Sequence, residues 1–84
     1  MSTGVQATTS IGSGQQKLYF TWGWPADRHV LWHVMPVTPA VGAPSLDWDV
    51  AVERANQSQC TYWITVKNHT AKTLTFELRY AILS

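Results

Sequence analysis

The segment Leu46-Asp47-Trp48-Asp49-Val50-Ala51-Val52-Glu53 alternates apolar side chains with polar or small ones. Successive side chains of a β-strand point to opposite faces, so a strand would bury the four large apolar residues together and leave all three carboxylates in water. A helix would spread the carboxylates around much of its circumference. The alternation therefore predicts a half-buried strand over residues 46–53.

Two later segments, residues 60–67 and 73–83, alternate in the same way. When two antiparallel strands keep these apolar residues on one face, the two residue numbers of each cross-strand pair add up to an even number. A turn of three or five residues after Asn68 satisfies this rule. By the same rule, the loop of the preceding hairpin falls within residues 55–59. We therefore expect a C-terminal three-stranded antiparallel meander, in which Trp63 lies opposite Glu77 or Arg79 on the outer face.

The N-terminal half holds two further strand patterns, residues 17–22 and 29–35. In the first, Leu18, Phe20 and Trp22 share one face, which we expect to point inward. Residues 36–45 contain three prolines and a glycine, so they lack regular structure, and a loop of this length suits a crossing between two sheets. The polar residues 1–16 form a flexible arm or an edge strand, and residues 17–84 form a single domain.

No segment shows a helical apolar period. Five or six short strands separated by turn signals are typical of an all-β fold. We therefore predict a small antiparallel β-sandwich, or a small barrel, of about six strands.

The composition narrows the class of protein. The 84 residues include five tryptophans and one cysteine, 13% are charged, and the formal net charge is +1. Such a chain is too aromatic and too weakly charged to be disordered, cannot form an internal disulfide, and lacks the basic excess of a nucleic-acid binder. A domain of this size has a thin margin of stability, which large aromatics or a partner subunit can improve. We expect a homo-oligomer.

Residues 1–14 carry neither the basic nor the apolar region of a secretory signal, and no apolar run approaches the roughly 20 residues of a membrane span. We therefore expect a cytoplasmic protein, or one exported without a conventional signal peptide. The weak net charge gives little attraction to anionic lipid, which argues against membrane attachment. The sequons at Asn56 and Asn68 are then not expected to be glycosylated.

Few residues could carry chemistry. His29 and His33 share a strand face but lie about 13 Å apart, because alternate strand residues are separated by roughly 6.6 Å, so they cannot share a metal ion. Cys60 begins a strand on its inward face, as a buried structural thiol would. Asp47 and Asp49 are spaced like paired glycosidase carboxylates, but a solvated strand face explains them better in so short a chain. We expect no enzyme activity, no metal and no cofactor.

The five tryptophans divide by strand parity. Trp22, Trp32 and Trp48 fall on inward faces, where their bulk suits a small core. Trp24 lies in a proline-containing loop and Trp63 lies on an outer face, so both are expected to be exposed. Because an exposed tryptophan is costly unless something covers it, these two residues are the candidates for recognition.

Trp24 has an acid, a base and an imidazole beside it in residues 24–29, which suits a shallow carbohydrate site. The predicted ligand-binding residues are Trp24, Asp27, Arg28, His29, Asp47 and Asn56. For Trp63 we favour a subunit interface or cation–π cover by Arg79. The predicted interface residues are Trp63, Glu77 and Arg79.

These features favour a small oligomeric, lectin-like module that binds glycans, with weak single sites strengthened by multivalency and with no nucleic-acid partner. The alternative is a structural self-assembly subunit of a shell, filament or decoration, since tryptophan and arginine are also enriched at protein interfaces. A membrane-attaching sandwich is a third hypothesis. A closed small oligomer would favour the first hypothesis and an open-ended polymer the second.

Overall fold

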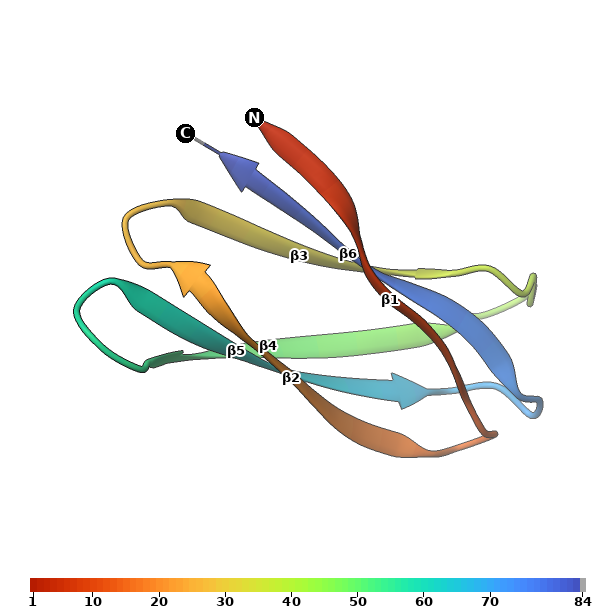
Figure 1. The fold of residues 1–84 in the computed structure, drawn as a ribbon. Helices are drawn as coiled ribbons and strands as arrows, with labels where there is room; N and C mark the ends of the chain where they lie inside the picture. The colour runs from red at the N-terminus through yellow and green to blue at the C-terminus, as the bar shows by residue number, and fades with distance from the viewer. Residues whose placement is uncertain (84) are drawn as a thin grey trace.

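The structure is a computed structural model that describes residues 1–83. These residues form six strands and no helix: β1 (Ser2–Ile11), β2 (Gln16–Pro25), β3 (His29–Pro36), β4 (Leu46–Arg54), β5 (Gln59–Asn68) and β6 (Leu74–Leu83). They pair into two antiparallel sheets, β1-β6-β3 (sheet A) and β2-β5-β4 (sheet B), which form the two layers in Figure 1. The predicted all-β sandwich is confirmed, and nothing helical within residues 1–83 could cross a membrane.

The core lies between the sheets and is built from alternate residues of the strands. Phe76 of β6 is fully buried, and Tyr19 of β2 meets it edge-on with ring centroids 5.9 Å apart. Burial of one such side chain contributes about 1.5–3 kcal/mol. Trp32 is buried too, although its Nε1 has no hydrogen-bond partner within residues 1–83. The buried apolar side chains are Ile11, Val30, Trp32, Val34, Leu46, Cys60, Ile64, Val66, Leu74, Phe76 and Leu78.

Residues 2–11, expected either as an arm or as an edge strand, form β1 along the edge of sheet A, paired with β6. The β4–β5 hairpin has the even parity and the loop position that the sequence predicts. Its pairs run from Leu46 opposite Asn68 to Arg54 opposite Cys60, with the loop at residues 55–58. Cys60 is buried, as expected of a structural thiol.

Two inward residues of β4, Val50 and Val52, keep their predicted parity but are 43% and 62% exposed. β4 is an edge strand of sheet B, so sheet A covers it incompletely. The edge of sheet A reaches β4 beside Trp48, whose ring meets the His33 ring edge-on at 5.3 Å. Trp48 is therefore half-buried rather than a full member of the core.

The predicted C-terminal meander is wrong. β5 pairs with β2 and β4, whereas β6 crosses to sheet A and lies between β1 and β3. The parity rule identifies residues that share a face, and a connection that crosses between the sheets satisfies it equally well. Trp63 consequently lies opposite Ala51 and Phe20, not opposite Glu77 or Arg79.

Asn68, at the end of β5, fixes the corner at which the chain changes sheets. It is fully buried, and its Nδ2 donates to the carbonyl oxygens of Ile11, Gly12 and Lys72 at 2.9–3.1 Å. Its Oδ1 accepts from the N–H and the hydroxyl of Thr70, both at 2.8 Å. One amide thus joins the β1–β2 turn to the β5–β6 turn.

The predicted orientation of β2 is also wrong. Tyr19 lies opposite the fully buried Ile64, so pairing with β5 turns Tyr19 inward and its more apolar neighbours outward. Trp22, expected in the core, is 71% exposed, and Leu18 and Phe20 are 58% and 55% exposed. Alternation alone could not decide between the two faces, because both carry large side chains.

A β-bulge gives Trp22 and Trp24 opposite orientations. Thr21 pairs with Tyr62 and Trp24 pairs with Cys60. Trp22 and Gly23 therefore lie together opposite a single residue of β5. Gly23 has φ +82°, a backbone conformation that glycine adopts at little cost. The extra residue turns Trp24 inward, where its Nε1 donates to Thr21 Oγ1 at 3.1 Å. Trp24 is therefore a packed residue of β2, not the exposed loop residue that we expected.

Candidate functional site

A row of aromatic rings lies on the outer face of sheet B, with Phe20 and Trp22 exposed and Trp63, which was expected to be exposed, half-buried. It consists of Trp22 and Phe20 from β2 and Trp63 from β5, which we call the aromatic strip. Phe20 stacks on Trp63 with centroids 4.9 Å apart, and Trp22 follows Phe20 at 5.8 Å. Because 71% of Trp22 is exposed, much of its indole is open to a ligand.

Strand geometry explains how these rings come together. Phe20 and Trp22 are two residues apart on β2 and therefore share a face. Trp63 lies directly across from Phe20 on the neighbouring strand, at a distance where aromatic pairs interact. The bulge at Gly23 then ends the row, because the next tryptophan of β2 points into the core.

Carboxylates border the aromatic strip on the β4 side. Glu53 Oε1 accepts a hydrogen bond from Trp63 Nε1 at 2.9 Å, which orients the indole. Asp49 stands in the same cross-strand row as Thr65 and Leu18. Among the described residues, the charged side chains of this outer face are Asp47, Asp49, Glu53 and Lys67, so its formal charge is −2.

The structure brings several predicted ligand-binding residues to one end of the sandwich. The Ala26 N–H donates to the Ser58 carbonyl at 2.9 Å, so the loop of residues 26–28 lies beside the loop of residues 55–58. The residues gathered there are Asp27, Arg28, His29 and Asn56, and all four are exposed.

Trp24 and Asp47 do not join this loop cluster. Trp24 packs edge-on against Trp32 and Tyr80, each at 5.0 Å between centroids. Asp47 lies near the start of β4, whereas Asn56 follows the end of that strand. The cluster therefore lacks the aromatic ring on which the carbohydrate hypothesis was built, and glycan binding by its other residues stays a prediction.

The predicted interface residues lie on opposite faces of the sandwich. Trp63 belongs to the outer face of sheet B, whereas Glu77 and Arg79 belong to the outer face of sheet A. Phe20 and Glu53 cover Trp63, so the expected cation–π contact with Arg79 is wrong. Arg79 instead donates from Nε and Nη2 to Glu77 Oε1 at 2.9 and 2.8 Å.

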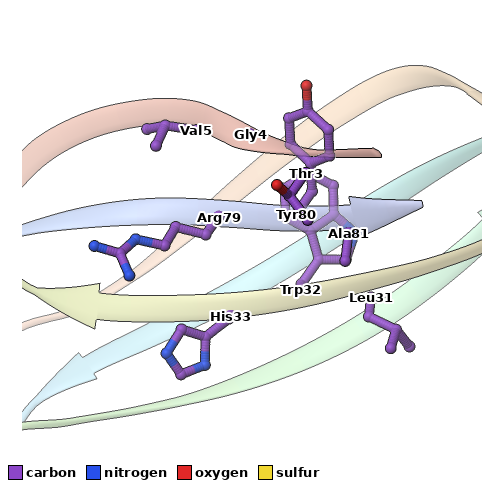
Figure 2. A pocket seen from close by; sticks show the side chains of 9 residues that line it. All are labelled: Thr3, Gly4, Val5, Leu31, Trp32, His33, Arg79, Tyr80 and Ala81. Carbon is purple, nitrogen blue, oxygen red and sulfur yellow. The ribbon is translucent and has the colours of Figure 1, made fainter. Parts of the chain in front are cut away.

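A hollow of about 540 Å³ opens on the outer face of sheet A. Figure 2 shows Arg79 and His33 together at one end of it and Leu31 at the other. These side chains come from β6 and β3, with β1 completing the lining. The hollow is shallow and mostly apolar, so it suits packing against another surface better than it suits enclosing a small polar ligand.

His69 and Asp47 form an exposed pair beside the loop of residues 40–44. Their Nε2 and Oδ2 atoms are 2.6 Å apart. Nucleophilic catalysis would need a nucleophile held by the imidazole, and within residues 1–83 the side chain bonded to that ring is the carboxylate of Asp47. The same residues contain no cluster of His, Cys, Asp or Glu side chains that could hold a metal ion.

Two tyrosines behind the aromatic strip have perturbed hydroxyl groups. Burial raises the pKa of Tyr19 above 10.0, and burial followed by the influence of Cys60 raises the pKa of Tyr62 in the same direction. Both hydroxyls therefore stay protonated at physiological pH. They are neutral inward residues and add no charge to the outer face of sheet B.

The sequence contains one indication of the aromatic strip that the alternation of apolar and polar residues does not capture. In an uninterrupted strand Trp22 and Trp24 would share a face, but the glycine between them permits a bulge that separates them. No family model, no curated protein and no solved structure matches this chain. The function is therefore inferred from the surfaces of the molecule itself.

Proposed function

We propose that this protein is a carbohydrate-binding module whose site is the aromatic strip of Phe20, Trp22 and Trp63. The observation that carries the proposal is a row of three aromatic rings, two of them exposed, with carboxylates alongside it. An exposed aromatic patch on a small soluble domain marks an interaction surface, because such surface is costly to leave in water. The class of partner follows from the charges around it.

Three classes of partner use exposed aromatic rings: nucleic acids, membranes and glycans. The formal charge of −2 on this face opposes phosphate backbones and anionic lipid headgroups. A neutral glycan meets no such repulsion. The C–H faces of its sugar rings carry weak positive charge and stack on the negative faces of aromatic rings.

The neighbouring polar groups suit the hydroxyls of the same ligand. Asp49 is exposed and presents acceptors, and Thr65 presents a hydroxyl one strand away. Glu53 already accepts from Trp63, so it holds the indole in place. The site is open and flat, which suits an extended chain of sugars with weak affinity per site.

The proposal is tested with Trp22→Ala on an array of neutral and acidic oligosaccharides, followed by calorimetry on the best neutral ligand. Truncation of the most exposed ring of the strip should cost about 2 kcal/mol, which corresponds to roughly a 30-fold loss of affinity. Asp49→Asn should weaken the same ligand less, because one hydroxyl contact is altered rather than removed. Neither residue is buried in the core, so the fold should persist.

The matched control is Arg28→Ala in the loop cluster, which should leave binding unchanged. If Arg28→Ala lost binding and Trp22→Ala kept it, the site would lie in the loop cluster and not on the aromatic strip. Vesicles of zwitterionic and anionic lipid serve as the second probe. Binding to vesicles without binding to any glycan would replace the carbohydrate proposal by the membrane hypothesis.

A further inference from the structure

The outer face of sheet A carries a projection next to a depression. Thr3, Ala81 and Leu31 form one cross-strand row, in which the small Ala81 is the central residue. Leu31 is 56% exposed on one side of it, and Val5, in the next row, is 50% exposed on the other strand. The hollow of about 540 Å³ in Figure 2 lies over this region.

A projecting residue and a depression on the same face make that face complementary to itself. Around a two-fold axis, Leu31 of each copy can enter the hollow over Ala81 of the other copy, so that the same contact occurs twice. This arrangement would cover the exposed leucine and fill the hollow at once. A protruding side chain and its hole on two different faces would instead build an open chain.

The charges on the two outer faces distinguish their possible partners. In the described residues, the formally charged groups on the outer face of sheet A are Glu77 and Arg79, which sum to zero. They already pair within the chain, with Arg79 Nη2 2.8 Å from Glu77 Oε1, and a two-fold axis that brings the two ion pairs together adds contacts between Arg79 of each copy and Glu77 of the other. Two copies of the outer face of sheet B would repel, because each carries a formal charge of −2.

The contact area required is modest for this molecule. A specific interface takes about 800 Å² from each partner, and the accessible surface of the chain is 5304 Å². A domain of this size benefits most from such burial, since its own core is small. We propose that two copies of this chain pack their sheet A faces together around a two-fold axis, with Leu31 in the partner's hollow.

The dimer places the two aromatic strips on opposite outer sides of the assembly, because sheet B lies on the far side of each sandwich. The dimer itself does not depend on glycan binding. Its functional consequence does rest on the proposed function: a bivalent module would cross-link glycan chains or gain avidity on a surface.

The test compares Leu31→Asp with Leu18→Asp by sedimentation equilibrium and light scattering. The two leucines are 56% and 58% exposed on opposite faces, so they are matched for stability and differ in the face they occupy. We expect the wild-type chain and Leu18→Asp to have twice the mass of one chain, and Leu31→Asp to be a monomer. Circular dichroism and thermal unfolding confirm that each variant is folded.

A charge exchange provides the second measurement. Arg79→Glu and Glu77→Arg should each weaken self-association through repulsion across the two-fold axis, and an equimolar mixture should restore dimers as heterodimers. A monomeric wild-type chain at submillimolar concentration, or a dimer that survives Leu31→Asp, overturns the proposal. Binding of a soluble oligosaccharide by Leu31→Asp reports on the aromatic strip alone, so either proposal can fail without the other.

Discussion

Asn68 shows how a single side chain can specify topology. Its amide binds the backbone of both turns at one corner of the sandwich and lies out of contact with water. Asn56 occupies a similar sequence context and also accepts from backbone N–H groups two and three residues ahead, those of Ser58 and Gln59. Asn56 is exposed, however. An asparagine that accepts from the backbone N–H two residues ahead therefore closes a local turn at Asn56 and joins two distant turns at Asn68.

Asn68→Ala should lower the free energy of unfolding by about 3 kcal/mol, because it removes the hydrogen bonds of a fully buried amide to Ile11, Gly12, Lys72 and Thr70 and leaves a cavity in its place. Asn56→Ala should lower it by less than about 1 kcal/mol, since water replaces the lost contacts. Urea unfolding followed by tryptophan fluorescence measures both variants. Similar losses in the two variants would show that Asn68 does not hold the corner together.

At the scale of strands, alternation was a reliable guide where one face is polar. β4 and β5 have a distinct polar face, so their inward faces and the even sum of their paired residue numbers could be predicted. β2 has large side chains on both faces, and its outer face is the more apolar one. Alternation therefore predicts Phe20 and Trp22 in the core and only Trp63 on an outer face. The exposure of large apolar side chains, which makes this prediction fail for β2, is also what makes the aromatic strip a candidate site.

The bulge of β2 can be tested through Gly23. A Cβ at this position would meet nothing within 4 Å, so substitution acts through the backbone and not through a clash. Gly23→Ala should cost about 1 kcal/mol and Gly23→Val more, whereas Gly23→Asn should cost least, because asparagine tolerates positive φ better than other residues. Thermal and urea unfolding rank the three variants. The reverse ranking, with alanine or valine the mildest change, would mean that positive φ is not required there.

At the scale of the whole molecule, the connections explain why the order of the strands could not be predicted. The β4–β5 hairpin joins strands that are neighbours in both sequence and space. The other pairings, β1 with β6, β2 with β5 and β3 with β6, unite strands that are far apart in the chain. Alternation indicates which face of a strand is buried, but no local pattern indicates which of the two sheets that strand joins.

This topology predicts slow folding that a circular permutation should accelerate. Ser2 pairs with Ile82, and Figure 1 shows the start of β1 beside the end of β6, so a short Gly/Ser linker can join the two strands. New ends between Val41 and Gly42 would fall in an exposed loop between strands of different sheets, so they would interrupt no strand pair. β6 and β1 would then become a local hairpin, which lowers the entropy cost of forming sheet A.

We expect this permutant to refold severalfold faster than the native chain in stopped-flow fluorescence, with a similar free energy of unfolding. A second permutant, with the same linker and new ends within residues 55–58, is the control. It gains the β6–β1 hairpin but loses the β4–β5 hairpin, so its refolding rate should stay near that of the native chain. If both permutants refold faster by the same factor, the β6–β1 connection speeds folding and the local β4–β5 hairpin makes no contribution to the refolding rate. If neither accelerates, formation of sheet A is not the slow step, and the long separation between β1 and β6 does not limit folding.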